Sequence, residues 1–389
     1  MSDLLRMVSP MQLSPEVQRL CEEVRRFIQK EVDPRARWIE EHDAIPEELV
    51  RTAREMGLFG ITIPEQYGGV GLDLAGKCAI EEEMGRTSYA FATFLGNHTG
   101  IGTAGIVALG NEAQKKKYLP RMASGEWIGC FALTEPQAGS DPAAMRAAAV
   151  RKGDRYVLNG EKIFITNGGV AQLFTVMAIT DKSKGIKGIS AFILERGFKG
   201  FAIGKNEHKM GMHGVTTVPL AFNDCEVPAE NLLGPEGMGY VQALKTLTMG
   251  RVTIAARCCG MMDRLIERCV EYMKTRVQGG KKLAEHQGLQ WMLADMGVQR
   301  DAARLLTWRA IELMVRGERG TLEASAAKLY ATEALGKVVD SAVQIHGGMG
   351  YMREAGIETV YRDARITRIY EGSSEIQRNI IAAQLLKDD

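Results

Sequence analysis

The stretch from about residue 127 to 232 constrains the fold most, because short β-rich runs separated by turn residues fill it. Asn159-Gly160 lies between Tyr156–Leu158 and Lys162–Thr166, an arrangement that predicts a two-residue hairpin. Three more β-rich runs follow at Leu173–Ile179, Ile189–Leu194 and Val218–Phe222. Together these runs predict a compact β unit, either a small barrel or a sandwich.

Helical patterns flank the β unit on both sides. Ser14-Pro15 combines a helix cap with a proline at the first helical position. The apolar residues that follow at helical spacing are Val17, Leu20, Cys21, Val24, Phe27 and Ile28. A second helix is expected between Pro46 and Gly57, and from about Gly239 onward long helices are expected to form an antiparallel bundle. We therefore expect an α+β multidomain protein, helical in 1–126, with the β unit in 127–235 and a helical bundle in 236–389.

Composition excludes several classes of function. The 49 basic and 48 acidic residues give a formal net charge of +1, which argues against nucleic acid as a partner. No apolar run reaches the roughly 18–20 residues of a membrane span, and residues 1–7 lack the pattern of a signal peptide. Seven cysteines without a C-x-x-C pair indicate no disulfide framework and no metal site. We expect the adjacent Cys258 and Cys259 to pack as small hydrophobes.

One acidic residue, Glu371, lies between the apolar residues Ile369 and Tyr370 and a glycine. Ser374 and Gln377 form a capping-box pattern, which predicts a helix that begins at Ser374. The helix dipole would favour the ionised carboxylate, whereas an apolar surround would raise its pKa and make it a useful general base. Without other evidence, a glutamate in such a turn is usually a solvated surface residue.

Two further stretches could hold a cofactor. Phe131–Asp141 passes from a strand through Thr134-Glu135-Pro136 into a glycine loop, whose N–H groups and hydroxyls can cradle a pyrophosphate. Phe164 and Thr166 should share one face of a strand, on which a flat ring could lie. On composition alone, a plain Pro/Gly turn and a core phenylalanine are the favoured interpretations.

Two glycine-containing stretches can also be interpreted as purely structural. Gln344–Gly350 is not a dinucleotide-binding fingerprint, and His346 is expected to be a packed or capping histidine. Thr248–Arg251 places Gly250 beside an arginine that would ordinarily be a surface ion pair. No Walker A loop, nucleophile elbow or H-E-x-x-H motif is present.

Taken together, three of these stretches resemble the signatures of the acyl-CoA dehydrogenases in order and spacing. They are Ala132–Asp141, Gln344–Gly350 and Ile369–Gln377, and the likeness extends from about residue 13 to the C-terminus. Ala303–Ala310 is most similar to the short-chain and general bacterial type. The resemblance implies a helical domain, a β-barrel and a four-helix bundle, a homotetramer, and FAD bound between barrel and bundle.

The resemblance also assigns roles by position. Flavin contacts fall on Phe131, Leu133, Thr134, Gly139, Ser140, Phe164, Ile165, Thr166, Ser373 and Glu375. Contacts to the flavin of a neighbouring subunit fall on Arg276, Gln287, Gln344, Gly347 and Gly348. Substrate contacts fall on Ser140, Thr248, Arg251 and Gly372. Many relatives have Phe where Gly279 stands, and Arg where His213 stands.

The implied reaction is α,β-dehydrogenation of a short- or medium-chain acyl-CoA, in which Glu371 removes the α proton and flavin accepts the β hydride. Electrons would pass to an electron-transferring flavoprotein, in the bacterial cytosol or the mitochondrial matrix. Some subfamilies place the base where Gly250 stands, so Glu371 is the candidate base here. Two alternatives stay open, an acyl-CoA oxidase that uses O₂ and an inactive acyl-CoA- or flavin-binding relative.

Overall fold

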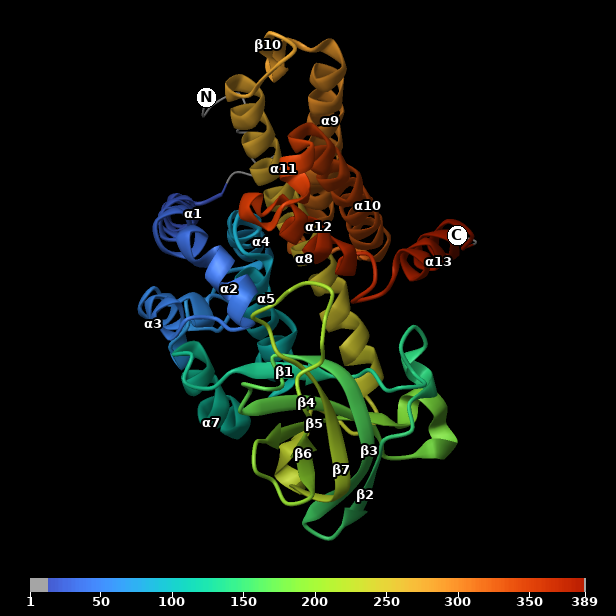
Figure 1. Cartoon of the computed structure of the whole chain (residues 1–389). Coiled ribbons are helices and arrows are strands. Elements are labelled where there is room, and N and C mark those ends of the chain that lie inside the picture. The colour runs from blue at the N-terminus through green and yellow to red at the C-terminus, as the bar shows by residue number, and fades with distance from the viewer. Residues whose placement is uncertain (1–12, 388–389) are drawn as a thin grey trace.

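The computed structural model describes residues 13–387, and Figure 1 shows helices above a β unit. The longest helix, α8 (Gly239–Thr275), rises from the β unit into the bundle, and the C-terminal helix α13 (Ser374–Leu385) projects to one side. No helix within the described residues is long and apolar enough to cross a membrane. Residues 1–7, on which the expectation about a signal peptide depends, lie outside the described part.

The N-terminal third is helical, as the sequence predicts. Its α-helices are α1 (Pro15–Phe27), α2 (Ala36–His42), α3 (Glu47–Glu55), α4 (Leu74–Met84), α5 (Tyr89–Asn97), α6 (Thr103–Leu109) and α7 (Glu112–Ala123). The Ser14 side chain accepts a hydrogen bond from the Val17 N–H, so the predicted cap of the first helix is confirmed. A short π-helix, His98–Gly102, follows α5 directly.

The central strands form one eight-stranded sheet. They are β1 (Gly129–Ala132), β2 (Ala148–Lys152), β3 (Arg155–Thr166), β4 (Leu173–Ile179), β5 (Ile189–Glu195), β6 (Phe201–Ile203), β7 (Thr217–Pro228) and β8 (Leu232–Leu233). The order is β6-β7-β3-β2-β4-β5-β8, and β1 pairs with β4 in parallel. In Figure 1, β4 and β5 cross β3 and β7. Because side chains of all four strands share one buried cluster, the sheet curves around its own core.

The predicted hairpin at Asn159-Gly160 is wrong. Strand β3 runs straight through these residues, and its register with β7 shifts there instead, which is a β-bulge. The Asn159 side chain serves the bulge, because it accepts from the Asp224 N–H at 2.9 Å and donates to the Asp224 carboxylate. The actual hairpin joins β2 to β3, with Lys152 opposite Arg155 and Gly153 at a φ of +63°.

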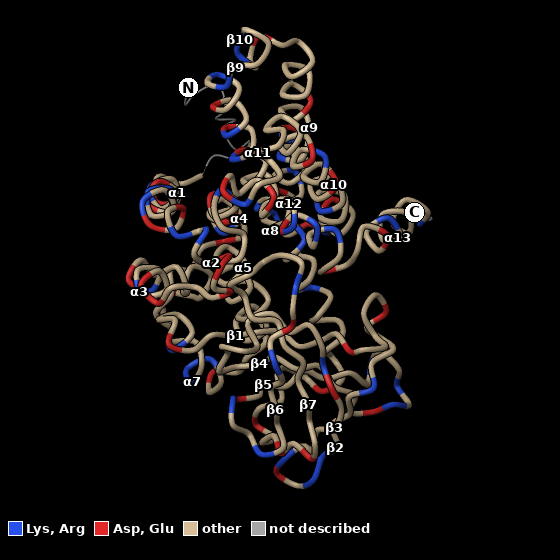
Figure 2. Tube along the Cα trace, viewed as in Figure 1, with Lys and Arg blue, Asp and Glu red and all other residues tan. Residues whose placement is uncertain are grey.

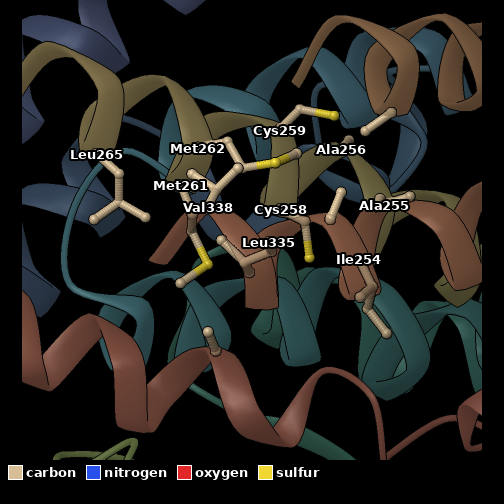
Figure 3. Packing of buried hydrophobic residues seen from close by; sticks show 14 of the residues in the cluster. Ile254, Ala255, Ala256, Cys258, Cys259, Met261, Met262, Leu265, Leu335 and Val338 are labelled. Carbon is tan, nitrogen blue, oxygen red and sulfur yellow. The ribbon is translucent and has the colours of Figure 1, made fainter. Parts of the chain in front are cut away.

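The C-terminal part is a helical bundle. Its helices are α8, α9 (Gln287–Val315), α10 (Thr321–His346), α11 (Gly348–Tyr351), α12 (Ile357–Ile366) and α13. Figure 3 shows Cys258 and Cys259 among apolar side chains of α8 and α10. Burial raises the pKa of the Cys258 thiol to about 12, so both cysteines pack as small hydrophobes, as expected.

Buried ion pairs attach the N-terminal helices to the bundle. Arg304 on α9 bonds to Glu82 on α4 at 2.7 Å and to Asp263 on α8 at 2.6 Å. Figure 2 shows basic and acidic residues interspersed along the whole trace, including the contact between α4 and α8. These pairs fix α4 against α8, and both helices contribute residues to the site described next.

Candidate active site

A cavity of about 1640 Å³ opens between the β unit and the bundle. Its walls come from the ends of β1 and β3, from α5, from the first half of α8 and from the turn before α13. The predicted site residues that line it are Phe131, Leu133, Thr134, Gly139, Ser140, Phe164, Ile165, Thr166, Thr248, Arg251, Glu371, Gly372 and Ser373. The fold thus gathers residues from four separate stretches of sequence around one space.

The remaining predicted residues lie elsewhere. Glu375 is exposed on the first turn of α13. Arg276, Gln287, Gln344, Gly347 and Gly348 are exposed near the ends of α8, α9 and α10 and are not among the described residues that line the cavity. The resemblance assigns these five residues to the flavin of a neighbouring subunit, and that assignment stays a prediction. His346 is packed, as expected, since its ring stacks on Tyr272 at 4.5 Å.

Glu371 occupies a left-handed turn between α12 and α13. Its φ is +51° and that of Gly372 is +92°, so two consecutive residues hold an uncommon conformation. The Lys328 ammonium donates to the Gly372 carbonyl at 2.7 Å, and the Gln377 side chain donates to the same carbonyl at 2.9 Å. These buried donors fix the turn and thereby the position of the carboxylate.

The capping box predicted at Ser374 and Gln377 is wrong, although α13 does begin at Ser374. Ser373 is the cap, since its side chain accepts from the Ile376 N–H. The Ser374 hydroxyl bonds to Glu333 instead, at 2.6 Å. With Ser373 as the cap, the third helical residue is Ile376, and the Gln377 amide nitrogen donates to the carbonyls of Glu371 and Gly372.

The Glu371 carboxylate faces the cavity and is poorly solvated. Its Oε2 atom is buried and has no hydrogen-bond partner within residues 13–387. Burial raises the pKa of Glu371 above its ordinary value, although the charges of Arg257, Lys328, Lys77 and Arg251 oppose the increase. The dry surround therefore outweighs the stabilising charges, which is the condition that suits a general base.

Gly250 makes room for this carboxylate. A Cβ atom at Gly250 would lie 1.9 Å from Glu371 Oε2, far inside a van der Waals contact. Helix α8 therefore contacts the base directly at a position without a side chain. The two family positions for a base meet in space, and only Glu371 carries a carboxylate.

A buried ion pair shapes the loop after β1. Lys162 on β3 is 0% exposed and its Nζ lies 2.7 Å from Glu135 Oε1. Glu135 also accepts from the backbone N–H groups of Arg146 and Ala147. Burial alone would raise the pKa of Glu135, but the Lys162 charge and these donors hold it below its ordinary value. The motif analysis missed this pair; a lysine among the β3 residues Ile163 and Ile165 was the available signal.

The residues around the loop fit a flat aromatic cofactor. Phe164 lines the cavity but is 63% exposed, so its ring offers an uncovered apolar surface. The Ile163 N–H donates to the Thr134 carbonyl at 2.9 Å, which holds the loop beside β3. The register of β3 with β7 shifts between Lys162 and Ile165, so Phe164 lies in an irregular part of the strand. Phe164 and Thr166 nevertheless both line the cavity.

The two departures from the family pattern have local explanations. Gly279 and Gly280 both have positive φ, +59° and +79°, and form the turn of a short hairpin between α8 and α9. An aromatic residue would be strained at this position. His213 Nδ1 is 2.8 Å from Glu40 Oε1, an oxygen that also pairs with Arg362, and His213 is not part of the described lining of the cavity.

The site and fold together define a class of protein. A large cavity with an uncovered aromatic ring, an open glycine loop and a desolvated carboxylate is suited to a flavin-dependent oxidoreductase. The acyl-CoA dehydrogenase N-terminal, middle and C-terminal domain models match residues 14–126, 130–225 and 237–386. The chain therefore belongs to the acyl-CoA dehydrogenase family of oxidoreductases, and the resemblance in its motifs is confirmed.

Individual relatives cover nearly the whole chain. A short-chain specific acyl-CoA dehydrogenase of Clostridium acetobutylicum is 44% identical, over 96% of this chain and 99% of that protein. The CarC subunit of the caffeyl-CoA reductase–Etf complex of Acetobacterium woodii is 40% identical, over 90% and 92%. The structure of an acyl-CoA dehydrogenase complexed with FAD from Bacillus anthracis matches with a TM-score of 0.91 at 36% identity, over 97% and 68%.

Proposed function

We propose that the chain binds FAD and oxidises a short- or medium-chain acyl-CoA to the trans-2-enoyl-CoA. The observation that carries this proposal is the Glu371 carboxylate, whose Oε2 atom has no hydrogen-bond partner within residues 13–387 and which lines the same cavity as the aromatic ring of Phe164. The short-chain specific relative and the FAD complex of another family member support the substrate class and the cofactor.

The residues of the cavity wall would bind the cofactor and the substrate and orient them. Thr134, Gly139, Ser140, Phe164 and Thr166 would hold FAD, which when bound accepts the hydride from the β carbon. Glu371 would take the α proton, which the thioester carbonyl acidifies. The backbone N–H of Glu371 would donate to the thioester oxygen as negative charge develops there. Ser140, Thr248, Arg251 and Gly372, all in the cavity wall, would contact the substrate.

The acceptor of the electrons is proposed to be an electron-transferring flavoprotein. The Acetobacterium woodii relative is named as a subunit of an Etf complex, and the other two relatives above are named dehydrogenases. The oxidase alternative finds no comparable support in these names. The alternative of an inactive relative is disfavoured by the intact base and cavity.

We also propose self-association, with a homotetramer as the expected form and the cytoplasm as the compartment. Trp291, Val298 and Leu305 are exposed on α9 and recur every seven residues, so they lie along one face of the helix. Such an apolar face suits contact with a second copy of the chain. Arg276 and Gln287 lie at the same end of the bundle and would there reach the partner's flavin.

The proposed function is tested by anaerobic titration of the purified, FAD-loaded protein with a series of saturated acyl-CoAs. Loss of the visible flavin absorbance on addition of a short or medium acyl-CoA is the expected result. Addition of an electron-transferring flavoprotein should then restore the absorbance faster than air does. A yellow protein that no acyl-CoA bleaches would overturn the proposal, and rapid recovery in air alone would favour the oxidase.

Gly250→Ala should reduce turnover about 100-fold, because its methyl group would displace the Glu371 carboxylate by an ångström or more. The fold should survive, since alanine favours a helix interior by roughly 1 kcal/mol over glycine. Gly297→Ala is the matched control, a glycine in α9 where a Cβ atom would have no atom of residues 13–387 within 4 Å. Equal kcat in Gly250→Ala and wild type would show that the carboxylate need not lie against α8.

The pH profile follows from the raised pKa of Glu371. Only the ionised carboxylate can accept the α proton, so kcat/KM should fall as the pH drops through that pKa. The acid limb should therefore lie above about 4.3, the ordinary pKa of glutamate. The measurement is kcat/KM across the pH range with a fast artificial acceptor. An acid limb at or below the ordinary value would contradict the desolvated site.

A further inference from the structure

The part of the cavity that α4, α5 and the middle of α8 border carries buried charged side chains. We call it the closed end; it is lined by Lys77, Thr93, Gly96, Asn97, Gly100 and Arg257. Lys77, Thr93 and Arg257 are all buried, whereas Leu244 and Met249 on the first turns of α8 are exposed and mark the mouth. A pocket for the apolar end of a fatty-acyl chain needs only apolar side chains. The buried charges at this end of the cavity therefore require an explanation.

The closed end lies where the far end of an acyl group would reach. Gly250 contacts the base, and Arg257 follows seven residues later on the same face of α8, about 10 Å further along the helix. The bulky CoA moiety must remain at the mouth. An acyl chain with its α carbon at Glu371 would therefore extend toward Lys77 and Arg257.

Arg257 has hydrogen-bond partners among these residues, but the Lys77 ammonium does not. Glu81 Oε2 accepts from Arg257 Nε at 3.0 Å and from Nη2 at 2.6 Å. The Lys77 ammonium, 5% exposed, has no hydrogen-bond partner among residues 13–387, and its nearest carboxylate oxygen, Glu81 Oε1, is 3.8 Å away. The amide of Asn97, whose Oδ1 also lacks a partner, lines the same end.

The carboxylate beside Lys77 is already engaged. Glu81 accepts two hydrogen bonds from Arg257, and it is the one carboxylate of the described residues within 4 Å of the Lys77 ammonium, at 3.8 Å. A buried ammonium without a hydrogen bond is costly, and a ligand anion would remove that cost. In agreement, burial lowers the pKa of Lys77, although the charges of Glu81 and Glu371 oppose the decrease.

We propose that the closed end is a binding site for a carboxylate at the far end of the acyl group, with Lys77 as its hydrogen-bond donor. The substrate class is then the CoA monothioesters of dicarboxylic acids. This inference rests on the function proposed above, and the reaction at the α and β carbons is unchanged. Lys77 sets specificity and takes no part in the chemistry.

The test compares two matched series, the dicarboxylic acyl-CoAs from succinyl- to suberyl-CoA and the methyl-ended acyl-CoAs from butyryl- to octanoyl-CoA. The FAD-loaded wild type should prefer the dicarboxylic member of the best pair in kcat/KM. Lys77→Met should reduce that preference by about 10- to 100-fold, the usual worth of a charged hydrogen bond. Lys245→Met removes an exposed cation elsewhere in the cavity wall and should leave the preference unchanged.

Three results would overturn the carboxylate site. The first is a wild type that oxidises the methyl-ended series as well as the dicarboxylic series, or better. This result contradicts the carboxylate site even if the Lys77→Met protein does not fold. An equal loss for both series in Lys77→Met would mean that Lys77 contributes to the reaction of every acyl-CoA and does not recognise a carboxylate at the far end of the acyl group. If neither series bleaches the flavin, the proposed function fails with it, whereas the first two results leave that function standing.

Discussion

Glu371→Gln should lower kcat by about 10³- to 10⁴-fold while the protein keeps its fold and its flavin. The amide has nearly the shape of the carboxylate but cannot take a proton from carbon. Gln377 and Lys328 hold the turn through backbone carbonyls, so the substitution leaves those hydrogen bonds in place. The readouts are single-turnover bleaching of the flavin, the visible spectrum and the thermal midpoint.

The matched control for the base is Glu354→Gln, an exposed glutamate that is not part of the described cavity wall. It should retain wild-type turnover. The assignment of Glu371 would be wrong if Glu371→Gln stayed fully active. Loss of flavin together with activity would instead point to a structural role.

Lys162→Met should destabilise the protein by about 3–5 kcal/mol, because it leaves the buried Glu135 charge without its counter-ion. Both side chains are almost completely buried, so solvent cannot compensate. Lys162 Nζ also donates to the Leu133 carbonyl at 3.0 Å, directly before Thr134. The same variant should therefore bind FAD more weakly, since the loop beside the flavin loses its support.

The comparison for this loss is Lys199→Met. Lys199 Nζ pairs with Glu226 at 3.1 Å, but its side chain is 83% exposed. An exposed pair contributes roughly 0–1 kcal/mol. Chemical unfolding of the FAD-loaded proteins measures the loss of stability in each of the two variants. A loss below about 1 kcal/mol in Lys162→Met would show that the buried pair contributes little to this fold.

Sequence patterns predicted the features that local periodicity and motif order determine. The α, β, α order, the Ser14 cap and the turn before α13 are all present. The family motifs identified the residues that meet at the cavity. Motif order carries information across distant stretches that periodicity alone lacks, which is why Thr134, Phe164 and Glu371 could be placed at one site.

The features that sequence analysis missed depend on tertiary contacts. Asn159-Gly160 is a bulge because Asn159 bonds to Asp224, a residue of β7, and no local signal separates that outcome from a turn. Lys77 resembles a solvated helix residue, since Glu81 follows it at the i,i+4 spacing of an ordinary surface ion pair. Only the packing of α4 against α8 buries it beside Arg257.

The most direct test of the account is whether Glu371 moves the α proton. FAD-loaded wild type and Glu371→Gln are incubated in D₂O with the best acyl-CoA, without an electron acceptor, and deuterium at the α carbon is measured by mass spectrometry. The account predicts steady incorporation by the wild type and a rate lowered about 10³-fold or more in the variant. Equal incorporation by the two proteins would contradict Glu371 as the base.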